Sequence, residues 1–147
     1  MKFEDIKMIV FDLNGTLSNY GRIDLNIREL FNILHQRGIK TVMVTSDQRH
    51  TANSIAKKLG VEYVVAESAV DKGNYVKENC KKDITVAIGN ARNDIPMFEC
   101  AGLSIVTLQS EGIHTEVLKY ADVVVPSFKD ALNLLIDKDT FESTLKE

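Results

Sequence analysis

The chain has 147 residues and a formal net charge of −3 at pH 7; 44% of its residues are hydrophobic and 27% are charged. This length favours one globular domain, 1–147, and the negative charge disfavours a broad nucleic-acid interface. No apolar run approaches the ~20 residues that span a bilayer, and the two cysteines lack metal-ligand spacing, so we expect a reduced, cytoplasmic protein that is not inserted into a membrane.

Short runs rich in Val and Ile alternate along the chain with helical patterns. The predicted strands are 7–13, 40–44, 62–65, 84–88, 103–106 and 122–125, and the predicted helices are 25–37, 48–59, 72–80, 95–100, 115–120, 128–136 and 140–146. Strands of this composition are typical of a sheet that is covered on both faces. The alternation predicts an α/β fold, a Rossmann-like three-layer sandwich with a mainly parallel central sheet.

Several residues mark the ends of these elements. Asp47 is placed to cap the helix 48–59, and Gly60 is placed to end it. Ser127 and Asp130 resemble a capping box for the helix 128–136. The polar turn 18–23 directly follows the first strand and predicts a small flap over the adjacent edge of the sheet.

The most informative stretch is the apolar run that ends at Asp12 and passes into a polar turn with Asn14, Gly15 and Thr16. A buried strand of this kind delivers a carboxylate to the carboxyl edge of a parallel sheet, where such sheets carry their chemistry. A carboxylate in that place can bind a cation or attack a phosphorus atom.

Polar residues also follow later strand candidates. Thr45 and Ser46 follow the strand 40–44, Lys72 begins the helix 72–80, and the segment 89–94 follows the strand 84–88. Because the carboxyl ends of parallel strands share one edge, we expect these residues to converge on Asp12. Hydroxyl donors and an ammonium group would hold the oxygens of a phosphate.

The same edge offers ligands for a divalent cation. Mg²⁺ prefers octahedral oxygen ligands, typically one or two carboxylates with phosphate and water. Asp12 and Asp94 supply the two carboxylates, and the Asn90 amide oxygen could bind directly or through water. Gly15 and Gly89 would let the backbone approach the phosphate and the metal closely.

Each of these residues has an ordinary structural explanation when it is taken alone. An aspartate after a strand is often a turn former, and Lys72 could be a solvated helix residue. Asn93 and Asp94, which precede Pro96, could simply cap a helix. Four candidate positions in order, each after its own strand, are difficult to attribute to chance, so we favour an active site.

These motifs resemble the haloacid dehalogenase-like hydrolase superfamily and, within it, the phosphorylation domain of P-type ATPases. The likeness covers nearly the whole chain. The segments that carry it are Asp12-Leu13-Asn14-Gly15-Thr16, Val44-Thr45-Ser46-Asp47, Asp71-Lys72 and Gly89-Asn90-Ala91-Arg92-Asn93-Asp94.

The resemblance implies an aspartyl-phosphate intermediate on Asp12 and Mg²⁺ as the cofactor. It assigns catalytic roles to Asp12, Asn14, Thr45 and Lys72, phosphate binding to Asp12, Gly15, Thr45, Ser46 and Lys72, and metal binding to Asp12, Asn14 (through its backbone carbonyl), Asn90 and Asp94. The spacings between these motifs are too short to hold a cap domain. The substrate that the resemblance implies is a phosphorylated small molecule or a phosphoprotein. Capless members usually act on large substrates or close their site with a neighbouring subunit, so a homo-oligomer is plausible.

Two asparagines depart from the pattern of the superfamily. Phosphatases carry an aspartate at the position of Asn14, where it protonates the leaving group and activates water. An amide cannot exchange a proton near neutral pH, and loss of a general acid or base typically costs ~10²–10⁴ in rate. Asn90 stands where a metal-binding aspartate is usual and removes one negative charge, so we expect slow hydrolysis and weaker Mg²⁺ binding.

The leading hypothesis is therefore a slow Mg²⁺-dependent phosphohydrolase or phosphotransferase that works through Asp12. The alternative is a non-catalytic or weakly active regulatory module related to the P-type ATPase phosphorylation domain, which the two amides motivate. A two-component receiver domain is disfavoured, because its phosphorylated aspartate follows the third strand. A dinucleotide-binding domain is disfavoured because no G-x-G-x-x-G follows the first strand.

Overall fold

In this computed structural model, which describes residues 1–146, the strands form a six-stranded sheet and every pairing is parallel. The strands are β1 (Met8–Phe11), β2 (Lys40–Thr45), β3 (Glu62–Val65), β4 (Thr85–Gly89), β5 (Leu103–Thr107) and β6 (Val123–Val125). Their order across the sheet is β3-β2-β1-β4-β5-β6, so the direction of winding reverses between β1 and β4. Such a reversal leaves a crevice outside the carboxyl ends of the two central strands.

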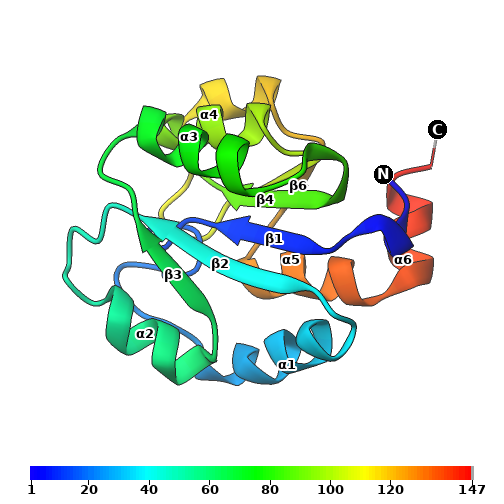
Figure 1. The fold of residues 1–147 in the computed structure, drawn as a ribbon, viewed down its shortest axis with the longest axis horizontal. Helices are drawn as coiled ribbons and strands as arrows, with labels where there is room; N and C mark the ends of the chain where they lie inside the picture. Colours follow the sequence, from blue (N-terminus) through cyan, green and yellow to red (C-terminus); the bar gives the residue numbers. More distant parts are fainter. Residues whose placement is uncertain (147) are drawn as a thin grey trace.

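Helices cover both faces of the sheet (Figure 1). They are α1 (Arg28–Gln36), α2 (Ala52–Leu59), α3 (Ala69–Asn79), α4 (Ile95–Glu99), α5 (Phe128–Ile136) and α6 (Lys138–Thr144). Helices α3 and α4 lie on one face, whereas α1, α2 and α5 lie on the other. The predicted three-layer α/β sandwich is confirmed, and the sheet is wholly rather than mainly parallel.

Alternate residues of β1 enter the two cores on either side of the sheet. Val10 belongs to the core under α3 and α4, while Phe11 belongs to the core under α1 and α5. The Phe11 ring packs against Phe31 and Phe128, with ring centroids 5.5 and 5.2 Å away. Packed apolar side chains therefore fix both faces of this central strand. This fixes the position of the next residue, Asp12.

The predicted helix 48–59 begins later than expected, at Ala52. Asp47 and His50 both have positive φ angles, 56° and 54°, so the chain forms a loop instead of a first helical turn. The Asp47 carboxylate still caps α2, because it accepts hydrogen bonds from the backbone N–H groups of Thr51 and Ala52 at 2.8 and 2.9 Å. Gly60 ends the helix in the left-handed conformation, as predicted.

Other boundaries moved by smaller amounts. The predicted strand 7–13 is shortened to Met8–Phe11, because the turn with Gly15 at φ +75° begins directly after Asp12. The predicted helix 72–80 is α3, which starts earlier, at Ala69 after its cap Ser68. The predicted helix 25–37 is a short 3-10 helix, Leu25–Ile27, that is followed by α1. The predicted helix 115–120 is the 3-10 helix Thr115–Lys119, and the predicted helix 140–146 is α6.

The expectation that both faces of every strand are covered fails at the edge strand β3. Three of its four residues are exposed, and Tyr63 and Val65 retain 39% and 51% of their surface. Elsewhere in residues 1–146 the connections between strands hold helices and loops, and none holds a further domain that would cover the carboxyl edge. No helix in this part of the chain has the length and apolar character needed to cross a membrane.

Candidate active site

Asp12 directly follows β1, at the carboxyl edge where the sheet reverses its order between β1 and β4. Its backbone N–H donates to the Ile88 carbonyl at 3.1 Å, which continues the pairing of β1 with β4 by one residue. The residue is only 5% exposed. One carboxylate oxygen, Oδ1, accepts a hydrogen bond from the Leu13 backbone N–H at 2.8 Å and contacts the Lys72 ammonium at 3.0 Å.

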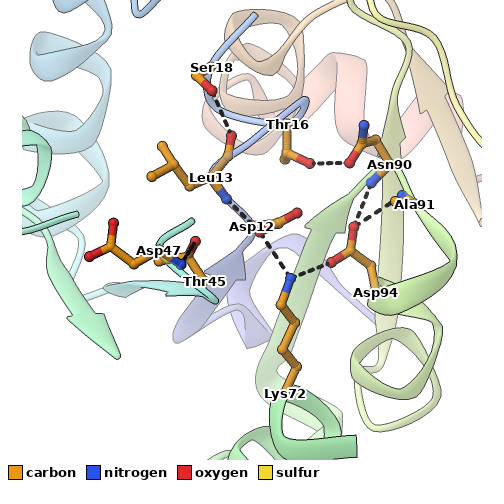
Figure 2. A network of polar contacts seen from close by, with 10 residues as sticks. All are labelled: Asp12, Leu13, Thr16, Ser18, Thr45, Asp47, Lys72, Asn90, Ala91 and Asp94. Atoms are coloured by element: carbon orange, nitrogen blue, oxygen red, sulfur yellow. Dashed lines mark hydrogen bonds and ion pairs between the residues drawn. The ribbon is translucent and has the colours of Figure 1, made fainter. Parts of the chain in front are cut away.

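Lys72 joins Asp12 to Asp94 (Figure 2). It projects from α3 with 1% of its surface exposed, and its Nζ lies 3.0 Å from Asp12 Oδ1 and 3.2 Å from Asp94 Oδ1. The second oxygen of Asp94 accepts from the backbone N–H groups of Asn90 and Ala91 at 2.9 and 3.1 Å. A buried ammonium between two buried carboxylates is retained only because all three charges are partnered.

Asn90 connects the loop after β4 to the loop after β1. Its Oδ1 accepts a hydrogen bond from the Thr16 hydroxyl at 3.0 Å, and both residues are buried. A Cβ at Gly15 would collide with the Asn90 amide, and one at Gly89 would lie 2.6 Å from Asp94 Oδ2. Gly15 therefore allows the loops after β1 and β4 to come together, and Gly89 allows the Asp94 carboxylate to fold back against the end of β4. The predicted contacts of both glycines with phosphate and metal stay predictions.

The other predicted residues lie at the same edge without direct contact to Asp12. Thr45 is fully buried at the end of β2, and its hydroxyl accepts from the Asp47 backbone N–H at 3.0 Å. Ser46 is half-buried, and its hydroxyl forms no hydrogen bond with any of residues 1–146. Asn14 is half-buried, and its Oδ1 is a buried acceptor that finds no donor in the same range.

The buried charges change the pKa values of this cluster. Burial raises the pKa of the Asp12 carboxyl, and repulsion from Asp94 raises it further, while Lys72 lowers it, so that it stands at about 7. Burial lowers the pKa of the Lys72 ammonium, but the attraction of Asp94 and Asp12 raises it by more, so Lys72 stays charged. These surroundings therefore move the pKa of Asp12 from the acid range to near neutral pH.

We expect divalent cations to bind more tightly at pH 8 than at pH 6. The pKa of the Asp12 carboxyl is raised from 3.8 to about 7 in the folded protein. At a pH between these two values, the carboxyl is therefore protonated in the folded protein but ionised in the unfolded chain. A cation held by the Asp12 carboxylate would have to displace that proton, so the apparent affinity should fall about tenfold per pH unit below 7. Titration of Mg²⁺ by calorimetry at both pH values measures this, and equal affinities would contradict it.

One segment near the site carried no sequence signal that we recognised. Gln109, in the loop after β5, adopts φ +49° and donates from its side-chain amide to the Thr16 carbonyl at 2.7 Å. Glu111 in the same loop accepts from the backbone N–H of Tyr20 at 2.6 Å. The flap predicted for 18–23 is a tight turn that this loop holds by hydrogen bonds. A non-glycine residue with positive φ is the kind of local strain that points to a constrained site, but it is invisible in sequence.

The sequence of the chain is similar to proteins of known family. The family model of haloacid dehalogenase-like hydrolases matches residues 19–102, which is more than half of the chain. A curated relative, the soluble P-type ATPase-like phosphatase of Methanocaldococcus jannaschii, is 24% identical over 127 residues, 84% of this chain and 46% of its own length. The zinc-transporting ATPase of Bacillus subtilis is 34% identical over 126 residues, again 84% of this chain but 19% of its own length. The chain thus spans less than half the length of either relative.

Solved structures share the fold. The 3-deoxy-D-manno-octulosonate 8-phosphate phosphatase of Moraxella catarrhalis, solved in complex with magnesium ion, phosphate ion and KDO, superposes with a TM-score of 0.75 at 17% identity and covers 98% of this chain and 95% of its own. A HAD family hydrolase from Streptomyces avermitilis superposes with a TM-score of 0.74 at 19% identity, covering 97% and 91% of the two chains. At these identities the likeness establishes the architecture alone.

Proposed function

The chain belongs to the haloacid dehalogenase-like hydrolase family, and from this premise we propose that it is a Mg²⁺-dependent phosphohydrolase or phosphotransferase. One observation carries the proposal. The Lys72 ammonium contacts the carboxylates of both Asp12, which directly follows β1, and Asp94, which lies in the turn between the neighbouring strand β4 and helix α4. A nucleophile, a cation and a second acid in contact at the carboxyl edge are the groups that phosphoryl transfer requires.

Asp12 acts as the nucleophile in this proposal. Oδ1 is held by Leu13 and Lys72, whereas Oδ2 forms no hydrogen bond with any of residues 1–146, and this second oxygen attacks the phosphorus atom. Lys72 compensates the negative charge of the incoming phosphate oxygens. The Thr45 hydroxyl accepts a hydrogen bond from the Asp47 backbone N–H and so keeps its own proton to donate to the phosphate. Gly15 and Ser46 offer further backbone and hydroxyl donors at the same edge.

The donor set fits a divalent cation. The oxygens that would hold the ion belong to Asp12, Asp94, the Asn90 side chain and the Asn14 backbone carbonyl, and hard oxygen ligands of this kind suit Mg²⁺. The ion would replace the present partners of the first three, which are Lys72 and Thr16. Within residues 1–146, no group of three or more His, Cys, Asp or Glu side chains is arranged to hold a metal ion, so this site offers two carboxylates rather than three. When bound, Mg²⁺ would supply positive charge that lets the anionic Asp12 approach an anionic phosphate.

Slow turnover follows from Asn14 in this proposal. Its amide neither takes a proton from water nor gives one to a leaving group. The aspartyl-phosphate that forms on Asp12 is therefore hydrolysed slowly and persists long enough to be detected. The open carboxyl edge is compatible with a phosphorylated small molecule or a phosphoprotein as the donor, and with a homo-oligomer that closes it.

The decisive experiment is intact-mass spectrometry after incubation with acetyl phosphate, with and without Mg²⁺. We expect a gain of one phosphoryl group that needs Mg²⁺, that maps to Asp12, and that beryllofluoride prevents by occupying the same carboxylate. The regulatory alternative predicts no label and the same behaviour for the wild type and Asp12→Ala. Absence of the label at every donor concentration would therefore end the proposal of an aspartyl-phosphate enzyme.

A further inference from the structure

Asn14 is the residue of the site whose chemistry is least explained by the proposed function alone. It lies in the turn two residues after Asp12 and is half-buried, with its Oδ1 buried and without a donor among residues 1–146. The unpaired oxygen can accept a hydrogen bond, and the amide NH₂ can donate one, but neither group can release or take up a proton near neutral pH. Asn14 can therefore orient an oxygen atom of a bound molecule without protonating it.

No neighbouring side chain takes over as the proton donor. Within the described residues, the titratable side chain that contacts Asp12 is Lys72, whose ammonium is held between Asp12 and Asp94. Asp94 is held by the Lys72 ammonium and by two backbone N–H groups. The Asp47 carboxylate caps α2 and points away from Asp12 in Figure 2. Phosphoryl transfer to Asp12 thus proceeds without a general acid supplied by the residues around it.

The consequence depends on the leaving group. When the bond between phosphorus and a bridging oxygen breaks, the oxygen leaves with the electron pair. A carboxylate leaves readily without a proton, since its conjugate acid has a pKa of about 4. An alkoxide resembles hydroxide, whose conjugate acid, water, is a far weaker acid than a carboxylic acid, so it needs protonation as the bond breaks.

We infer that Asn14 restricts the phosphoryl donor to anhydrides, such as acyl phosphates, and excludes alkyl phosphate esters; this inference rests on the proposed function. The step balances without a proton donor. Asp12 Oδ2 forms a bond to phosphorus, the bond from phosphorus to the bridging oxygen breaks, and the acyl group departs as a carboxylate. Water later attacks the phosphorus of the aspartyl-phosphate, the Asp12 carboxylate is released, and the proton of that water passes to solvent or to the phosphate product.

Acetyl phosphate and ethyl phosphate form a matched pair for the test, because they have nearly the same size and differ in the acidity of the leaving group. The quantity to compare is kcat/KM, which ends at the departure of the leaving group and is independent of the slow hydrolysis that follows. We expect the wild type to use acetyl phosphate and to use ethyl phosphate barely at all. Asn14→Asp should raise kcat/KM for ethyl phosphate by ~10²–10⁴ and change that for acetyl phosphate far less.

Asn90→Asp is the matched control, because it adds the same charge to the same site. The Asn90 side chain accepts a hydrogen bond from Thr16. This variant should therefore not raise the kcat/KM for ethyl phosphate relative to the kcat/KM for acetyl phosphate. An equal rise in both variants would mean that charge, not proton donation, sets the preference, and would overturn the inference.

A measurement on the wild type decides the matter even when Asn14→Asp does not fold. With a series of aryl phosphates of similar size, kcat/KM should fall steeply as the phenol becomes less acidic, because no acid compensates the leaving oxygen. A flat dependence, or ready use of ethyl phosphate together with a label on Asp12, would overturn the inference and leave the proposed function standing. Absence of any label from any donor would overturn both.

Discussion

Replacing Asp12 with asparagine is expected to abolish phosphoryl transfer while leaving the chain folded. The side chain is the nucleophile in the proposed mechanism, and an amide oxygen does not form a stable bond to phosphorus under these conditions. Loss of a covalent nucleophile lowers turnover by at least ~10⁴ in comparable enzymes. Release of inorganic phosphate from acetyl phosphate and the mass label on the protein should both disappear.

The fold should tolerate this change because of the charges around Asp12. Lys72 keeps its contact with Asp94 at 3.2 Å, so no buried charge is left alone. Asp71→Asn is the matched control, since Asp71 is exposed on the helix that carries Lys72 and forms no ion pair within residues 1–146. A variant at Asp12 that retains the turnover of this control would show that the phosphate is bound or transferred elsewhere.

Lys72→Met is expected to give the largest loss of stability among single substitutions in the site. The substitution leaves the buried carboxylates of Asp12 and Asp94 without their counter-ion, and breaking a buried charge pair in this way costs about 3–5 kcal/mol. For a domain of this size we expect the melting temperature to fall by roughly 10 °C in the absence of metal. Thermal unfolding followed by circular dichroism measures the change.

Magnesium should separate the loss of the ammonium from a general packing defect. A cation that binds the two carboxylates supplies the positive charge that the methionine side chain lacks, so Mg²⁺ should raise the melting temperature of Lys72→Met more than that of the wild type. Lys77→Met, an exposed change on the same helix, should shift the free energy of unfolding by less than about 0.5 kcal/mol. An equal response to Mg²⁺ in the wild type and Lys72→Met would indicate that the ion does not bind between these carboxylates.

Some elements were predictable because their signals are local. Helix α5 occupies Phe128–Ile136, as predicted, since the Ser127 hydroxyl accepts from the Asp130 backbone N–H at its start and its apolar face repeats with the helical period. The start of α2 was not predictable in the same way. The positive φ angles of Asp47 and His50 produce the loop that precedes it, and neither residue type requires that conformation.

The site shows the same division. Asp12 could be placed at the carboxyl edge because it directly follows an apolar run. In a parallel sheet, the residue after a strand lies at the edge where all the strands have their carboxyl ends. Three contacts could not be predicted, because each joins segments that are far apart in the sequence. Lys72 lies between Asp12 and Asp94. Asn90 accepts a hydrogen bond from Thr16, and Gln109 holds the loop after β1.

The sequence by itself determined the order of the strands and helices along the chain. It also determined the side chains that could take part in phosphoryl transfer, including Asn14, whose amide cannot act as an acid. Only the tertiary structure decided which strands are neighbours and which charges touch. The adjacency of β1 and β4 brings Asp12 and the Asn90 loop together, and α3 then delivers Lys72 to both carboxylates. The physical reason is that caps, turns and apolar periodicity act over a few residues, whereas these contacts follow from packing two helical layers on one sheet.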